Sequence, residues 1–246
     1  MSRTGTGVAL ARTTSAHESR ERRERRECRE RRERRERLQR ARADARREPV
    51  LSTAREAFVE LGLEGASLRE IARRAGYTAG AIYGYFASKE DVYATLLAES
   101  LARLSARVAD AELPAAASDA AHDELRLRAL AFFDFYRENP RDLDLGFYLF
   151  HGMQPRGLTP QWNERLNARL RDAMRLQEAA LRRLGFGAEE ALTEVTALFA
   201  HTVGLLVLRH TGRIRMFGRA AQDLFVHYVE DLLRRAPAPA GPRRRP

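Results

Sequence analysis

The chain has 246 residues, of which 44% are hydrophobic and 32% are charged, so it can bury one large core or two modest ones. Its single cysteine, Cys28, excludes a disulfide framework and a cysteine-ligated zinc site and favours the reducing cytosol. The longest uncharged apolar run, Val195–Leu208, is too short to span a bilayer, and the apolar patch at Val8–Ala11 is too short for a signal peptide. We therefore expect a soluble cytoplasmic protein without a membrane partner.

The formal net charge of +10 is concentrated in an amino-terminal arm, which we place at residues 1–46. Residues 1–47 hold 17 arginines and 8 acidic side chains, a net charge of +9, whereas the rest of the chain is nearly neutral. Glutamate recurs at every third position from Glu18 to Glu36, which pairs glutamate with arginine along a helix but gives no apolar stripe. Two interpretations stay open: an electrostatic tether that follows DNA phosphates, or a low-complexity extension, including a start codon assigned too early.

A helix is predicted to begin at Leu68, because Ser67 and Glu70 have the spacing of a capping box. The apolar residues from Leu68 through Ile71 onward form one stripe, and Gly76 can adopt the positive φ that ends the helix.

The next helix is predicted to be capped by Thr78 and to run through about Phe86. Its small residues, Ala79 and Gly80 among them, let the backbone approach a groove floor, while Thr78 and Tyr85 can reach phosphates or base edges. Ile82 and Phe86, four residues apart, are expected to hold the helix in a core. Two capped helices joined by a glycine turn are typical of a helix-turn-helix.

A third helix is predicted to begin at Lys89, because Ser88 and Asp91 repeat the capping spacing. Lys89 is the only lysine beside 43 arginines. An ammonium group at a helix amino terminus suits a phosphate, although a solvated lysine is the alternative.

From about Val50 to Leu104 the chain resembles the amino-terminal DNA-binding domain of TetR-type transcriptional regulators. The resemblance is carried by AREAF, which ends at Leu61-Gly62, and by SLREIARRAG, TAGAIYGYF and SKED. It implies an all-α fold of about nine helices, with a three-helix helix-turn-helix domain followed by a helical ligand-binding and dimerisation domain. Ala79 and Gly84 depart from the bulkier residues common in the family, so this helix should make fewer base contacts. The expected DNA-binding residues are Ser67, Thr78, Ala79, Gly80, Tyr83, Tyr85 and Lys89, with Tyr83 where the family's phosphate-contacting tyrosine lies.

We expect the DNA-binding domain at residues 47–106, with the helix-turn-helix at about 69–88, the second domain at 107–235, and a disordered basic tail at 236–246. Prolines and glycines divide the second domain into helices, and no alternating strand pattern occurs. The predicted helices after the helix-turn-helix are 89–112, 119–138, 141–151, 160–184, 188–209 and 217–235.

The last two helices are predicted to form a homodimer through a four-helix bundle, as the resemblance also implies. One is apolar on two faces, which indicates two partners. The expected interface residues are Ala197, Ala200, Gly204, Leu224, Phe225 and Tyr228. Two helices buried within a monomer are the alternative.

Seven of the chain's nineteen aromatic residues fall within residues 132–150, which indicates either a ring-filled core or the ligand pocket that TetR-like regulators keep in this domain. The candidate ligand residues are Phe132, Tyr136, Phe147, Tyr148, His151, Trp162, Met174, Gln177, Phe199 and Thr202, with His201 as a further polar anchor. The six histidines show no paired metal-ligand spacing, so neither metal nor cofactor is expected.

These features predict a nucleoid-associated repressor that leaves a palindromic DNA operator when a largely apolar effector binds. Nothing in the sequence indicates a catalytic centre, so an enzyme is not expected. An effector-independent architectural DNA-binding protein and a transcriptional activator stay open as alternatives.

Overall fold

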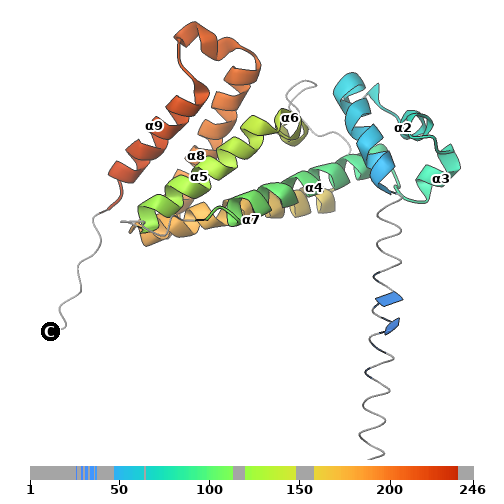
Figure 1. Ribbon diagram of the computed structural model, residues 1–246, viewed down its shortest axis with the longest axis horizontal. Coiled ribbons are helices and arrows are strands. Elements are labelled where there is room, and N and C mark those ends of the chain that lie inside the picture. Colours follow the sequence, from blue (N-terminus) through green and yellow to red (C-terminus); the bar gives the residue numbers. More distant parts are fainter. Residues whose placement is uncertain are drawn as a thin grey trace, which may run out of the picture. The chain divides into compact units, whose positions relative to one another are not determined.

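The described residues of the computed structural model are helical almost throughout (Figure 1). They are 47–63, 65–112, 120–147 and 158–237, together with isolated positions between 26 and 37. No strand occurs in these ranges, which confirms the all-α class. The chain divides into two units, residues 1–53 and 54–246. In the first unit the described arm positions are helical and exposed, in keeping with a solvated charged helix, and the rest of residues 1–46 lies outside the described residues.

The DNA-binding domain expected from sequence is built from a helix over residues 47–63, hereafter the first helix, then α2 (Leu68–Arg74), α3 (Ala79–Tyr83) and the long α4 (Lys89–Ala109). The predicted caps are confirmed. The hydroxyls of Ser67, Thr78 and Ser88 accept hydrogen bonds from the backbone amides of Glu70, Ala81 and Asp91, at 3.1, 3.2 and 3.2 Å.

Two glycines shape the turns of this domain. Gly76 has a φ of +74° and ends α2, as predicted. By contrast α3 stops at Tyr83, three residues before its predicted end. The backbone there changes to hydrogen bonds between residues three apart, as in a 3-10 turn. The amide of Gly84 donates to the Ala81 carbonyl at 3.2 Å. Glycine is also a poor helix former, by about 1 kcal/mol relative to alanine, so nothing local extends α3.

The second part of the chain contains α5 (Ala120–Glu138), α6 (Pro140–Phe147), α7 (Pro160–Arg183), α8 (Ala188–His210), the 3-10 helix η1 (Arg213–Phe217) and α9 (Ala221–Arg234). The last helix begins at residue 221 and not at 217 as predicted. Gly212 and Gly218, both left-handed at φ +70° and +61°, bracket η1 and separate it from α9.

The core of this part is made of packed helices and rings. α4, α5 and α7 pack on one another, and α8 packs on α7 and α9 (Figure 1). The rings of Phe133 on α5 and Phe225 on α9 stack at 4.4 Å and 14°. Arg126 reinforces this pair of helices with a two-pronged bond to Glu230, at 2.6 and 3.0 Å.

Arg128 on α5 secures the carboxyl end of α4. Its guanidinium donates to the carbonyls of Val108, Ala109 and Ala111, the last two at 2.8 Å. The carbonyls of Val108 and Ala109 belong to the last turn of α4, which lacks intrahelical partners, and that of Ala111 follows the helix. The arginine therefore satisfies groups that would otherwise need water.

α8 is the one helix in the described ranges that is long and apolar enough to cross a membrane by length and composition. Its buried residues, Leu198, Thr202 and Leu206 among them, belong instead to the packed interior of the chain. Core helices pass the same test, so α8 is weak grounds for a membrane span.

Candidate nucleic-acid interface

α3 presents an open surface of small side chains. Thr78, Ala79 and Gly80 are exposed, and apart from its chain neighbours and the backbone of its own helix no atom lies within 4 Å of the point where a side chain on Gly80 would begin. Tyr83 projects from the same short helix with 53% of its surface exposed, and Tyr85 follows it half-buried. An exposed helix with almost no side-chain bulk can bring its backbone close to a groove floor.

The other face of α3 is fixed in the core. Ile82 is fully buried and Phe86 is 1% exposed, which confirms the structural role predicted for both. Because the side chains of Ile82 and Phe86 are packed in the core, the position of α3 is fixed. Thr78 and Tyr83 are therefore held in place by a packed helix and not by a loop.

An ion-pair network braces α2 against the first helix. Glu70 accepts from Arg73 at 2.7 Å and from Arg74 at 2.8 Å, and Arg74 also reaches Glu60 at 2.6 Å. Hydrogen bonds from Arg73 and then Arg74 lower the pKa of Glu70 from 4.5 to about 2. The Glu70 carboxylate therefore accepts from these arginines. The capping box had predicted that it would accept from the backbone amide of Ser67 instead.

Lys89 has a role that sequence reasoning missed. Its ammonium donates to the backbone carbonyl of Leu63 at 2.8 Å, which ties the start of α4 to the end of the first helix. The side chain is half-buried and has a further interaction within the chain. No spacing rule links residues 63 and 89, so only the fold could show this contact.

Two arginines of α2 extend the basic surface beyond the predicted set. Arg69 is exposed, and the Arg73 side chain keeps 72% exposure while it pairs with Glu70. Ser67, predicted as a DNA contact, is exposed but uses its hydroxyl to cap α2.

Several predicted ligand residues fill the core. Phe132 and Tyr136 are each 1% exposed and meet edge-to-face at 5.5 Å, and burial raises the pKa of Tyr136. Gln177 is 1% exposed, and Thr202 is fully buried with its hydroxyl donating to the Leu198 carbonyl at 2.9 Å. The side chains of these four residues are therefore part of the packed core in this structure.

The remaining predicted ligand residues lie elsewhere. Phe199 is half-buried and meets Phe132 at 6.0 Å, Met174 is half-buried, and Trp162 is half-buried with Arg165 over its ring at 5.7 Å. The side chain of Phe147, and Tyr148 and His151 entirely, lie outside the described residues. Within the described residues no group of three or more metal-ligating side chains is placed to hold an ion.

Of the residues predicted to form the dimer interface, most have exposed or half-exposed side chains and one is buried. Ala200 and Gly204 are exposed, and Ala197, Leu224 and Tyr228 are half-exposed. Phe225 needs correction, because its ring is fully buried on Phe133 of the same chain and is not available to a partner.

Three large exposed apolar side chains on α8 and η1 were not predicted. Leu192 on α8 is 56% exposed, and Met216 and Phe217 on η1 are 77% and 62% exposed. Tyr228 stacks on His201 at 4.1 Å, and burial lowers the pKa of His201.

Comparison with known proteins shows which family the helix-turn-helix domain resembles. Residues 50–96 match the model of the bacterial regulatory proteins of the tetR family, over the helices that carry the exposed α3. The likeness to the tetR family is thus shown for the DNA-binding domain. The relatives of this chain are transcription regulators and not enzymes.

Among curated TetR-family relatives, AcnR of Corynebacterium diphtheriae, a transcriptional repressor, is 38% identical over 65 residues, which cover 26% of this chain and 34% of AcnR. FasR of Mycolicibacterium smegmatis, a transcriptional activator, is 34% identical over 106 residues, which cover 42% of this chain and 46% of FasR. The chain thus aligns with less than half the length of either relative.

Solved structures show that the TetR-family fold extends beyond the DNA-binding domain. PfmR of Thermus thermophilus superposes with a TM-score of 0.57 at 22% identity, over 79% of this chain and 98% of PfmR. FadR of Bacillus halodurans, a fatty acid degradation regulator, gives 0.56 at 18% identity, over 80% of this chain and 96% of FadR. At such identities the likeness concerns the fold alone.

Proposed function

We propose that this TetR-family protein is a cytoplasmic homodimeric repressor that binds a palindromic DNA operator at the nucleoid and is released by a small, largely apolar effector. The observation that carries the proposal is the exposed surface of α3, presented from the buried anchors Ile82 and Phe86. Such a helix has the form that a recognition helix requires in a major groove.

The DNA contacts divide by chemistry. The exposed Tyr83 hydroxyl and the Lys89 ammonium bind phosphates, and Arg69 adds a third backbone contact from α2. Thr78 and Tyr85 reach base edges, while Ala79 and Gly80 provide the close fit. Because α3 carries so few polar side chains, a substantial share of the specificity comes from the shape of the DNA.

Two copies pair through the exposed stripe of α8 and the outer side of α9. Ala200 and Gly204 allow close approach of the two α8 helices, and Leu224 and Tyr228 add apolar area beside them. Two-fold symmetry then presents two α3 helices to a palindromic site, where successive major grooves require them to lie about 34 Å apart.

The effector acts through α4, which begins at Lys89 and ends in the second part of the chain. An effector that binds more tightly when α4 is displaced lowers DNA affinity by that difference in binding free energy. FasR is named as a transcriptional activator, and an activator would use the same DNA contacts with the opposite effect on transcription. A reporter assay with the native promoter distinguishes the two outcomes.

The test is DNA binding by purified protein, measured by fluorescence anisotropy on the intergenic DNA beside its own gene and on random duplex of equal length. A Tyr83→Ala, Lys89→Ala double variant should lose at least about tenfold in affinity at moderate salt, since Lys89 contributes counterion release and Tyr83 contributes a hydrogen bond to a phosphate. An Arg175→Gln variant, altered at an exposed site on α7, is the control. Undiminished binding by the double variant would rule out the proposed surface. Equal affinity and salt slope on both DNAs would favour the architectural alternative.

A further inference from the structure

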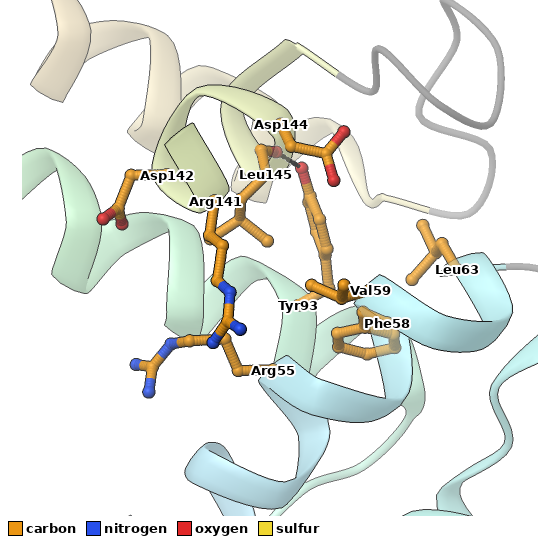
Figure 2. Close-up of a pocket in the computed structure, with 9 residues that line it drawn as sticks. All are labelled: Arg55, Phe58, Val59, Leu63, Tyr93, Arg141, Asp142, Asp144 and Leu145. Atoms are coloured by element: carbon orange, nitrogen blue, oxygen red, sulfur yellow. Dashed lines mark hydrogen bonds between the residues drawn. The ribbon is translucent and has the colours of Figure 1, made fainter. Parts of the chain in front are cut away.

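A recess lies where the first helix, α4 and α6 meet (Figure 2), and its described lining includes none of the residues predicted to bind a ligand. Its volume is about 50 Å³. One water-sized group needs roughly 10–15 Å³ by the same measure, so the recess has space for an end group of three or four carbons.

The floor and walls of the recess are apolar. They come from Phe58, Val59 and Leu63 of the first helix, Tyr93 of α4 and Leu145 of α6. The Tyr93 hydroxyl donates to the Leu145 carbonyl, as Figure 2 shows, so its polar end is satisfied and its ring forms a wall. Val59 is 45% exposed although it is apolar, which leaves this part of the recess open to water.

Among the described residues, the rim of the recess has one free charge, and it is positive. Asp142 accepts a hydrogen bond from Arg103 at 2.5 Å, and Arg55 lies 3.5 Å from Glu99. Asp144 also has an interaction within the chain. Arg141, in contrast, is exposed and makes no hydrogen bond or ion pair with any residue that the structure describes. Figure 2 shows its side chain extending toward Arg55, so an anion at this point would face two guanidinium groups.

We propose that this recess binds a short aliphatic monocarboxylate. The branched or straight alkyl end packs against Phe58, Val59 and Tyr93, and the carboxylate accepts a forked pair of hydrogen bonds from Arg141. A neutral ligand of the same shape lacks this contact, and a longer chain exceeds the volume.

The position of the recess gives such a ligand a regulatory consequence. Bound there, it touches the first helix and α6 together, so it stabilises one arrangement of the helix-turn-helix domain relative to α6. This consequence rests on the proposed DNA-binding function, whereas binding of the carboxylate does not.

The experiment titrates 3-methylbutanoate into the full-length protein without DNA, followed by ligand-observed saturation-transfer NMR, with 3-methylbutanamide as the neutral isostere. We expect saturable millimolar binding of the acid and about two- to fivefold weaker binding of the amide, the scale of one exposed ion pair. Arg141→Gln should weaken binding of the acid by a similar factor, and Arg175→Gln on α7 should leave it unchanged.

A second variant tests the apolar part of the site. Val59→Phe fills the recess from a partly exposed position, so the protein should fold and lose binding of the acid at least tenfold. No saturable binding to the wild type, equal binding of acid and amide, or full binding to Val59→Phe would each overturn the proposal. Because DNA is absent from the titration, those outcomes would leave the proposed operator binding intact.

Discussion

The ammonium of Lys89 lies 2.8 Å from the backbone carbonyl of Leu63, a contact between residues 26 positions apart. It joins the end of the first helix to the start of α4. The same side chain is proposed to bind a phosphate, so its two roles need to be measured separately.

Lys89→Met tests both roles at once. Loss of a hydrogen bond from a charged group should lower the free energy of unfolding by about 1.5–3 kcal/mol, measured by urea denaturation. If Lys89 also binds a phosphate, the slope of log K against log salt should fall by about 0.9 for each subunit, measured by anisotropy. Reduced stability with an unchanged salt slope would assign Lys89 to structure alone.

Gly80→Ala should separate stability from DNA binding. Gly80 lies inside α3 and a new methyl group would meet open space, so alanine should stabilise the protein by about 1 kcal/mol in thermal or urea unfolding. The same methyl group would stand on the surface proposed to approach DNA and should weaken operator binding. A stabilised variant with undiminished affinity would show that this part of α3 does not approach the groove closely.

Acidification should weaken the ion-pair network of Glu70. Arg73 and Arg74 hold its pKa at about 2, below the usual 4.5, so its stabilising contribution is fully present above about pH 4.5 and is lost as the pH falls toward 2. Side-chain carboxyl NMR should report this lowered pKa, and Arg73→Gln should raise it. Arg69→Gln, at an exposed arginine of the same helix, should leave it unchanged. An ordinary pKa for Glu70 in the wild type would contradict the network.

Phe225 and Phe217 should respond in opposite ways to substitution. Phe225→Ala removes a fully buried ring from the stack on Phe133 and should cost about 3–5 kcal/mol of unfolding free energy. Phe217→Ser changes a ring that is 62% exposed and should alter monomer stability by at most about 0.5 kcal/mol. If η1 borders the proposed dimer surface, Phe217→Ser should also raise the dimer dissociation constant in sedimentation experiments. A large loss of stability in Phe217→Ser would contradict its exposed position.

The features that the sequence predicted correctly depend on short chain separations. The caps at Ser67, Thr78 and Ser88 join residues three apart, and the turn at Gly76 depends on one backbone angle. Such features follow from local stereochemistry, so spacing alone is sufficient to predict them. The end of α3 was harder to predict from the sequence, because helix propensity and a tight turn compete over two or three residues.

The contacts that could not be predicted from the sequence join residues that are far apart along the chain. Nothing in the periodicity of α9 distinguishes Phe225, which faces Phe133, from Tyr228, which remains half-exposed. Likewise an aromatic-rich stretch has the same pattern whether its rings pack on one another or surround a cavity. The recess beside Tyr93 was missed for the same reason, since its walls come from three separated helices.

The three carbonyls held by Arg128 anchor the carboxyl end of α4 to α5. α4 has 21 residues and is therefore about 31 Å long. With that end pinned, a tilt of only about 5° would carry the opposite tip sideways by roughly 3 Å, from the length of the rod alone. A rotation too small to disturb the packing around that anchored end would therefore shift Lys89 by about the length of a hydrogen bond.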